Sequence, residues 1–179
     1  MQILAIAGSL RSGSVNAQLL QLAAETVPGG VELAVWKGLR EIPPFDQDTE
    51  EIPSVAVAGL RSAVAGADAV LIATPEYNGS IPGTLKNALD WGSRPGATNA
   101  FRGKPVAVIG ASPGAFGGVW AHEETRKILG IMGARVVGAG FSLGKAQERL
   151  AAPDEELFGQ LRDVVETLVS EATARANAA

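Results

Sequence analysis

The sequence predicts an α/β protein in which one parallel β-sheet lies between two layers of helices. Short apolar runs alternate with helix-length segments along the chain, three of these runs are almost continuously apolar, and small or turn-forming residues closely follow each of the three. Strands that helices cover on both faces are expected to be apolar in this way. Since right-handed crossovers place successive helices on both faces, we expect one domain spanning residues 1–179, with five strands in the order 2-1-3-4-5.

Five segments have the length and composition of β-strands. The continuous apolar runs at residues 2–7, 68–74 and 105–110 are predicted to form buried strands. Residues 31–36 and 134–139 are predicted to flank them. In a sheet of this order, ligands bind outside the carboxyl ends of the strands, beside the first strand. The loops after the first, third and fourth strands are therefore the candidate binding loops.

Helical spacing fills the segments between the strands. We expect Pro53 to lie in the first turn of one helix, and the charges of residues 153–156 to open the last helix, whose end from residue 172 to 179 is expected to fray. Residues 37–52 are irregular and too short to form a domain. The positions predicted to share one helix face are Leu19, Leu22, Ala23 and Val27; Val57, Leu60 and Val64; Thr125, Leu129 and Met132; and Leu157, Leu161, Val164 and Leu168.

Composition excludes several classes of function. A net charge of −4 argues against electrostatic capture of nucleic acid or of an anionic membrane. The absence of cysteine excludes disulfides, thiolate nucleophiles and cysteine-ligated clusters, and one histidine, His122, excludes a multi-histidine metal site. No apolar run approaches the roughly 20 residues of a membrane span, and residues 1–8 lack the basic start of a secretory signal. A cytoplasmic protein without a metal site is expected.

The loop after the first strand, GSLRSGSVN at residues 8–16, has the features of a phosphate cradle. It opens a helix, whose start offers free backbone N–H groups, and Arg11 adds a guanidinium. A plain N-capping loop would also be rich in serine and glycine, but Arg11 favours an anion. The loop lacks the lysine of a P-loop, because Ser14 directly follows Gly13, and it contains no GxGxxG. A terminal phosphomonoester remains as the expected ligand.

Two further loops are expected beside this cradle. PEYNGSIPGTLKNALDW, at residues 75–91, supplies a stiff backbone that can approach a flat ligand, together with the aromatic ring of Tyr77. In the alternative interpretation Tyr77 and Trp91 only pack, and for Trp91 we favour packing or a subunit contact. ASPGAFGGVW, at residues 111–120, is a third loop of small residues. Together the three loops predict one slot at adjacent strand ends.

These three motifs, in this order, resemble the NADPH-dependent FMN reductase family, a flavodoxin-like group that includes bacterial quinone, chromate and azo reductases. The resemblance covers nearly the whole chain, and PEYNGSIPGxLKNAxDW is its most specific part. It implies a flavodoxin-like three-layer sandwich that binds FMN and uses NADPH or NADH as co-substrate. The chain departs from the family pattern at Val119, where relatives often have arginine.

The resemblance also implies a role for individual positions. One group would hold the FMN phosphate, a second would line the isoalloxazine, with Glu76 acting mainly through its backbone, and a third would border the ribityl chain and the ring. These groups are Ser9, Arg11, Ser14, Asn16 and the backbone around Val15; Pro75, Glu76, Tyr77, Asn78 and Gly79; and Ser112, Gly114 and Gly117.

The implied activity is a ping-pong reaction in which NAD(P)H reduces FMN at N5 and a small acceptor, such as a quinone, chromate, an azo compound or free flavin, then reoxidises it. The flavin does the chemistry, so no catalytic side chain is assigned, and Tyr77 and Asn78 are expected to face the substrate. Two rivals remain: a flavodoxin-type electron carrier, which would be expected to be more acidic than −4, and a flavin-free binder of phosphosugars or nucleotides.

Other residues have weaker assignments. We expect a structural role for His122, while Arg94 and Arg102 either meet the 2′-phosphate of NADPH or are solvated loop charges. By resemblance, the helices that begin near residues 85 and 119 are subunit contacts, which predicts a homodimer and leaves a tetramer open. The sequence selects neither the acceptor nor the nicotinamide.

Overall fold

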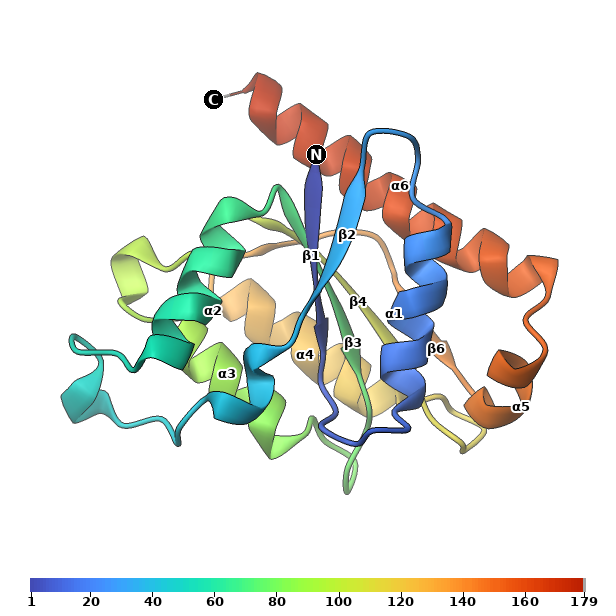
Figure 1. The fold of residues 1–179 in the computed structure, drawn as a ribbon, viewed down its shortest axis with the longest axis horizontal. Helices are drawn as coiled ribbons and strands as arrows, with labels where there is room; N and C mark the ends of the chain where they lie inside the picture. Colours follow the sequence, from blue (N-terminus) through green and yellow to red (C-terminus); the bar gives the residue numbers. More distant parts are fainter. Residues whose placement is uncertain (179) are drawn as a thin grey trace.

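The computed structural model describes residues 1–178 and has the predicted α/β architecture (Figure 1). Its parallel sheet runs in the order β2-β1-β3-β4-β5, with β6 also paired to β4, so the predicted strand order is confirmed. Every residue of β3 and β4 is buried, as expected for strands covered on both faces. The strands are β1 (Gln2–Ala7), β2 (Glu32–Trp36), β3 (Ala69–Thr74), β4 (Pro105–Ala111), β5 (Arg135–Val136) and β6 (Phe141–Leu143).

Helices cover both faces of the sheet (Figure 1). One hydrophobic cluster joins the sheet to α2, α3 and α4, and a second joins it to α1, α5 and α6. These clusters form the two interfaces of the predicted three-layer sandwich. The helices are α1 (Val15–Glu25), α2 (Val55–Gly66), α3 (Gly83–Gly92), α4 (Val119–Ile131), α5 (Ala146–Ala151) and α6 (Glu155–Asn177), with 3₁₀ turns η1 (Gly38–Glu41), η2 (Gln47–Thr49) and η3 (Gly96–Thr98).

The fifth strand is broken, which the sequence did not predict. In place of one strand over residues 134–139, β5 and β6 pair with successive parts of β4, separated by a bend at Gly138–Gly140. Both glycines have positive φ, 59° and 64°, and a Cβ at Gly140 would collide with the carbonyl oxygen of Val108. The buried ring of His122 bonds that carbonyl instead, with Nε2 2.9 Å from the oxygen. This contact agrees with a structural role for His122.

Two predicted details of the helices are wrong. Pro53 precedes α2 rather than lying in its first turn, because Ser54 is the N-cap and its Oγ accepts from the N–H of Val57. The predicted apolar face of α6 is confirmed, since the partly buried Val164 packs against the same cluster as Leu157, Leu161 and Leu168, which the fully buried Val165 also joins. The same helix continues past Ala172, which packs in the α1–α6 cluster, as far as Asn177 instead of fraying; residue 179 lies outside the described residues.

Residues 37–52 form a strap across α2 and α3. The carbonyl oxygen of Pro43 accepts from Asn87 Nδ2 at 2.8 Å and from Trp91 Nε1 at 2.9 Å. Trp91 is only 2% exposed, so its role in this chain is internal packing. The strap also reaches the first binding loop, because Arg40 Nη2 donates to the carbonyl oxygen of Leu10 at 2.8 Å. These contacts hold the loop after β1 against the body of the protein.

Candidate cofactor site

The carboxyl ends of β1, β3 and β4 meet at one edge of the sheet, where the three predicted loops enclose a cavity of about 100 Å³. The structure brings most of the predicted residues together in it, with the exception of Asn78, Gly79, Gly114 and Gly117. The lining residues are Ser9, Arg11, Ser14, Val15, Asn16, Pro75, Glu76, Tyr77, Ala111, Ser112, Pro113 and Gln147.

The loop after β1 has the properties of an anion cradle. Ser14 caps α1, its Oγ accepting from the N–H of Ala17 at 3.2 Å, while the backbone N–H groups of Val15 and Asn16 lie in the first turn, where a helix has no internal acceptors. The exposed guanidinium of Arg11 lies over Gly13, where a Cβ would be 3.5 Å from Nη2. Within residues 1–178 Arg11 makes no ion pair. Its positive charge is therefore available to an anion at the helix start.

Asn16 joins this cradle to the end of β4. Its Nδ2 donates to the carbonyl oxygen of Ala111 and its Oδ1 accepts from the N–H of Ala111, both at 2.9 Å. The side chain is only 1% exposed. Because both the Oδ1 and the Nδ2 of this buried side chain bond to Ala111, we expect Asn16 to contribute to phosphate binding through its backbone N–H. The side chain instead fixes the spacing between two walls of the cavity.

The loop after β3 carries a tight turn at residues 77–80. The N–H of Tyr77 donates to the carbonyl oxygen of Ser80 at 2.9 Å, and the N–H of Ser80 donates back at 3.1 Å. Between them Asn78 and Gly79 have φ values of 55° and 74°, the left-handed pair of a type I′ turn, for which Asn-Gly is the favoured sequence. The turn leaves Tyr77 51% exposed at the edge of the cavity.

The side chain of Glu76 has a role that the sequence interpretation missed. Its Oε2 accepts from the N–H groups of Trp120 at 3.0 Å and Ala121 at 3.2 Å, in the first turn of α4. The N-cap of that helix is Gly118, which has no side chain to cap with. Glu76 therefore caps α4 from another loop, so the expectation that it works mainly through its backbone was incomplete. This bond connects the second and third binding loops.

Two glycines of the third loop lie off the cavity for structural reasons. Gly117 is buried, and a Cβ there would lie 2.5 Å from the backbone carbon of Ser142 on β6. Gly114 is engaged with α5, since its carbonyl oxygen accepts from the N–H of Lys145 at 3.0 Å. Sequence reasoning also missed Gln147, which reaches the cavity from α5, because no motif marks that segment. Ala111 and Pro113 also line the cavity; both lie within the third motif, but their apolar side chains gave no sign of a binding role.

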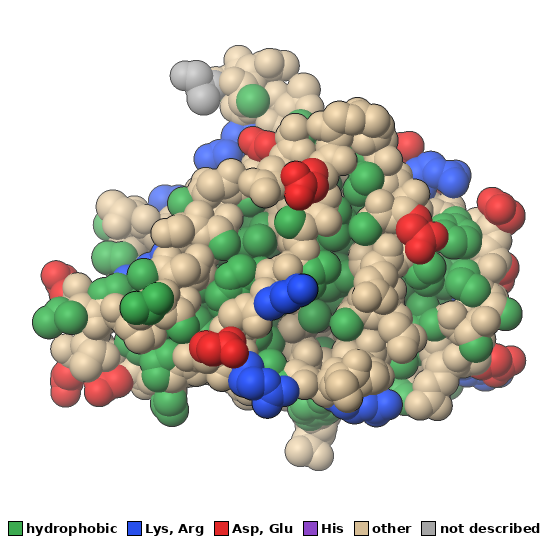
Figure 2. All heavy atoms as spheres, in the orientation of Figure 1, with side chains coloured by type: hydrophobic (Ala, Val, Ile, Leu, Met, Phe, Trp, Pro, Cys, Tyr) green, Lys and Arg blue, Asp and Glu red, His purple; other side chains and the backbone are tan. Residues whose placement is uncertain are grey.

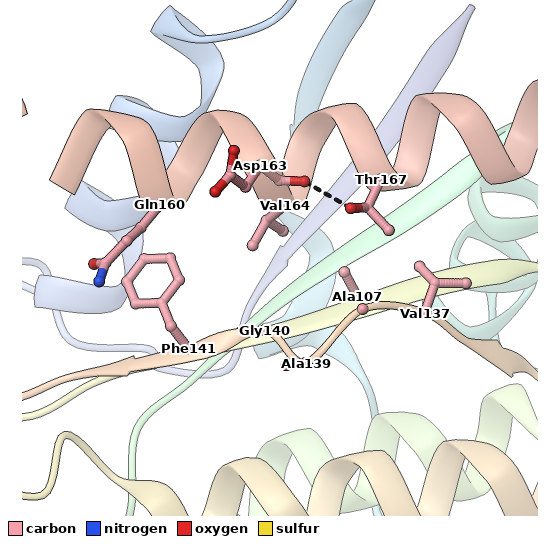
Figure 3. Close-up of a pocket in the computed structure, with 10 residues that line it drawn as sticks. Ala107, Val137, Ala139, Gly140, Phe141, Gln160, Asp163, Val164 and Thr167 are labelled. Carbon is pink, nitrogen blue, oxygen red and sulfur yellow. Dashed lines mark hydrogen bonds between the residues drawn. The ribbon is translucent and has the colours of Figure 1, made fainter. Parts of the chain in front are cut away.

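A larger cavity, of about 290 Å³, lies between α6 and the broken edge of the sheet (Figure 3). It is lined by backbone at residues 138–140, by Phe141 and Val164, and by the side chains of Gln160 and Asp163. None of its lining segments is a helix start, and the carboxylate of Asp163 would repel a phosphate. The smaller cavity is therefore the better candidate for a phosphorylated ligand.

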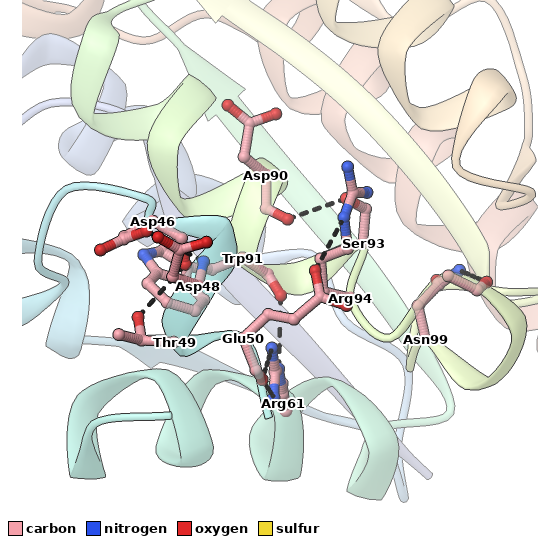
Figure 4. Close-up of polar contacts among 11 residues, drawn as sticks. Asp46, Asp48, Thr49, Glu50, Arg61, Asp90, Trp91, Ser93, Arg94 and Asn99 are labelled. Atoms are coloured by element: carbon pink, nitrogen blue, oxygen red, sulfur yellow. Dashed lines mark hydrogen bonds and ion pairs between the residues drawn. The ribbon is translucent and has the colours of Figure 1, made fainter. Parts of the chain in front are cut away.

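A third cavity, of about 510 Å³, collects Arg94 and Arg102 at the C-terminal ends of α3 and α4. The structure thus places both arginines on a cavity separate from the cradle of Arg11. Arg94 is already engaged: its Nη1 donates to Ser93 Oγ at 2.9 Å and its Nε lies 3.5 Å from a carboxylate oxygen of Glu50 (Figure 4). Both arginines lie away from the candidate cofactor cavity, so the suggested contact with a 2′-phosphate has no support here.

Two kinds of feature are missing from residues 1–178. No helix in that part of the chain combines the length and apolarity that a membrane crossing requires. No three His, Cys, Asp or Glu side chains in the same range gather into a group that could hold a metal ion.

Fold and site together define a flavodoxin-like α/β protein with an anion cradle at its strand ends, and comparisons identify its family. Residues 1–148 match the model of the NADPH-dependent FMN reductase family. An NAD(P)H-dependent FMN reductase from Pseudomonas aeruginosa is 46% identical over 132 residues, covering 72% of this chain and 69% of that protein. A quinone reductase from Escherichia coli is 34% identical over 163 residues, covering 89% and 86%.

A solved structure extends the similarity to three dimensions. FerB from Paracoccus denitrificans, a flavoenzyme NAD(P)H:(acceptor) oxidoreductase, matches with a TM-score of 0.81 and 28% identity, over 95% of this chain and 98% of that one. The chain belongs to the NADPH-dependent FMN reductase family. It is an oxidoreductase of that family, with FMN as cofactor and NAD(P)H as reductant.

Proposed function

We propose that this protein transfers hydride from NAD(P)H through FMN to a quinone-type small acceptor in a ping-pong reaction. The observation that carries the proposal is the cavity at the strand ends, lined by the start of α1, by Arg11, whose exposed guanidinium lies over Gly13, and by the exposed Tyr77. The relatives named as quinone reductases support the choice of acceptor class.

The cavity suits the phosphate end of FMN. At about 100 Å³ it has room for a phosphate and the adjoining chain, whereas whole cofactors of flavin size occupy pockets of roughly 300 Å³ or more. The residues of the exposed 77–80 turn would then lie toward the ring. Arg11 and the N–H groups of Val15 and Asn16 would hold the phosphate, and Ser9 and Ser112 would offer hydroxyls nearby.

Bound FMN would supply the hydride chemistry, and the protein supplies orientation and electrostatics. Glu76 and Tyr77 are the lining residues, besides Arg11, that can ionise. The carboxylate of Glu76 is engaged with the start of α4, and the ring of Tyr77 is open to water. We therefore assign no general acid or base, and we propose that Tyr77 and Asn78 face the nicotinamide and the acceptor in turn.

A direct experiment separates this proposal from its rival, an electron carrier without nicotinamide turnover. Protein loaded with FMN is mixed anaerobically with NADPH or NADH, and flavin absorbance is followed before and after addition of benzoquinone. We expect rapid bleaching by a nicotinamide and recovery with the quinone. A flavin that neither nicotinamide bleaches would identify a carrier, and a protein that takes up no FMN would exclude both functions. The low net charge and the dispersed charged side chains on the face in Figure 2 favour the reductase.

We also propose that the protein forms a homodimer through the outer face of α4. Phe116, just before α4, and Trp120, in its first turn, are 69% and 57% exposed, with ring centroids 5.7 Å apart, and Ile131 at the C-terminal end of α4 is 77% exposed. Large apolar side chains gathered on one exposed face are typical of a contact surface. Light scattering after size-exclusion chromatography should give twice the chain mass for the wild type and a monomer for Trp120→Glu. A monomeric wild type refutes the dimer, and four copies would show that dimers pair.

A further inference from the structure

We infer that Glu76 and Glu124 are positioning residues that fix the 77–80 turn against α4 and so order one wall of the cofactor site before FMN binds. The two carboxylates act in opposite directions. Glu76 reaches from the loop to the first turn of α4, while Glu124 reaches from α4 back to the loop. We call this pair the carboxylate clamp. The inference rests on the proposed function, because the turn matters here as a wall of the FMN site.

The contacts of Glu124 hold the far side of the turn. Its Oε2 accepts from Ser80 Oγ at 2.6 Å and from the N–H of Ile81 at 3.3 Å. Ser80 is also the residue that closes the turn through its paired backbone bonds to Tyr77. Glu124 therefore restrains the residue that pairs with the backbone of Tyr77. Short bonds between a hydroxyl and a carboxylate are among the stronger hydrogen bonds in proteins.

The contacts of Glu76 hold the near side. Its carboxylate faces two N–H groups at the positive end of the α4 dipole, where a negative charge is stabilised. Position 118 favours glycine because its φ is 85°, and a Cβ there would lie in van der Waals contact with the Cβ of Glu76, at 3.4 Å. Within residues 1–178, these two carboxylates make all the side-chain hydrogen bonds between residues 75–81 and α4.

The clamp matters because the tip of the turn is exposed to solvent. Tyr77, Asn78 and Gly79 are all exposed, and within residues 1–178 the side chains that bond this loop to α4 are those of Glu76 and Glu124. A loop that is already ordered costs less to immobilise when a ligand binds. If the ordered fraction of the turn falls to about one fifth or one tenth, the apparent dissociation constant for FMN rises about five- to tenfold.

The test uses Tyr77 as a probe, because it is the only tyrosine in the chain. Incorporated 3-fluorotyrosine gives a single ¹⁹F resonance, recorded in the FMN-free full-length protein and again with FMN. The variants are Glu76→Ala and Glu124→Ala, with Glu76→Gln and Glu124→Gln keeping one acceptor oxygen should an alanine variant fail to fold. The matched control is Glu123→Gln, which removes a carboxylate one position away on α4 that makes no bond to the loop.

We expect both alanine variants to shift and narrow the apo resonance and to weaken FMN binding about five- to tenfold, with partial rescue by glutamine and no change in the control. An apo resonance identical to wild type in both alanine variants overturns the inference. An altered resonance with unchanged FMN affinity also overturns it, since the order of the turn would then have no effect on FMN binding. Failure of the proposed function is distinguishable: the wild type itself would not bind FMN, whatever the ¹⁹F spectra show, and the inference would fall with it.

Discussion

Replacing Arg11 with alanine removes the one charged donor of the phosphate cradle. A hydrogen bond to a charged group contributes about 1.5 to 3 kcal/mol, or roughly 12- to 160-fold in the dissociation constant. The structure favours the lower end, because Arg11 is exposed and the backbone N–H groups of Val15 and Asn16 remain in place. We therefore expect Arg11→Ala to weaken FMN binding by about 1.5 kcal/mol, or roughly tenfold.

The assay is quenching of flavin fluorescence, performed with both FMN and riboflavin. Riboflavin lacks the phosphate, so Arg11→Ala should lower the affinity for FMN while leaving that for riboflavin nearly unchanged. Arg162→Ala is the control, because it removes one exposed arginine from α6, far along the chain from the cradle. Equal affinities of Arg11→Ala and wild type for FMN would refute the cradle, and an equal loss for both flavins would show that Arg11 supports the ring site and not the phosphate.

Three other predictions concern the stability of the fold and the contacts of β4 with neighbouring segments. Burial lowers the pKa of His122 in the folded protein, so below pH 6.5 the unfolded chain binds the proton more readily than the folded one. The free energy of unfolding should therefore fall as the pH drops from 6.5 toward the lower folded pKa, by at most about 1.4 kcal/mol per pH unit. Urea unfolding of His122→Gln should lack this pH dependence. Gly140→Ala should lower the free energy of unfolding by about 2 kcal/mol or more, because the new Cβ would collide with backbone and the residue has a positive φ. Gly159→Ala, at an open helical position, should raise it by about 0.5–1 kcal/mol. Equal urea midpoints for the two variants would contradict this. Asn16→Asp places an acceptor oxygen against a carbonyl oxygen of β4, so it should lower the free energy of unfolding by about 1–3 kcal/mol and weaken FMN binding. An unchanged melting temperature in calorimetry would contradict this.

The central fold could be predicted because its causes are local. The runs at 2–7, 68–74 and 105–110 are apolar on both faces, which only a strand covered on both sides requires. The broken edge strand could not be predicted in the same way. The segment around Gly140 has the composition of a strand, and the bend is fixed by a carbonyl on β4 and a histidine on α4, distant in sequence. Tertiary contacts therefore overrode the local pattern.

The same distinction separates the predicted and the missed parts of the site. Arg11 and Tyr77 could be recognised because a guanidinium or an aromatic ring in a loop of small residues after a predicted strand is visible in the sequence itself. The partners of Asn16, Glu76 and Glu124 could not be recognised, because each side chain bonds groups that lie 43 to 95 residues away.

This division has a physical reason. A group that binds a ligand has no protein hydrogen-bond partner until the ligand arrives. Such a group is stable only where water can solvate it, as at the exposed Arg11. A group that fixes the distance between loops has to be satisfied already, and its bonds gain strength from burial, as for Asn16. Substituting a free group should therefore change ligand affinity with little effect on folding, whereas substituting an engaged group should change both. Parallel measurements of FMN affinity and unfolding free energy for Arg11→Ala and Asn16→Asp would show whether the two kinds of residue separate in this way.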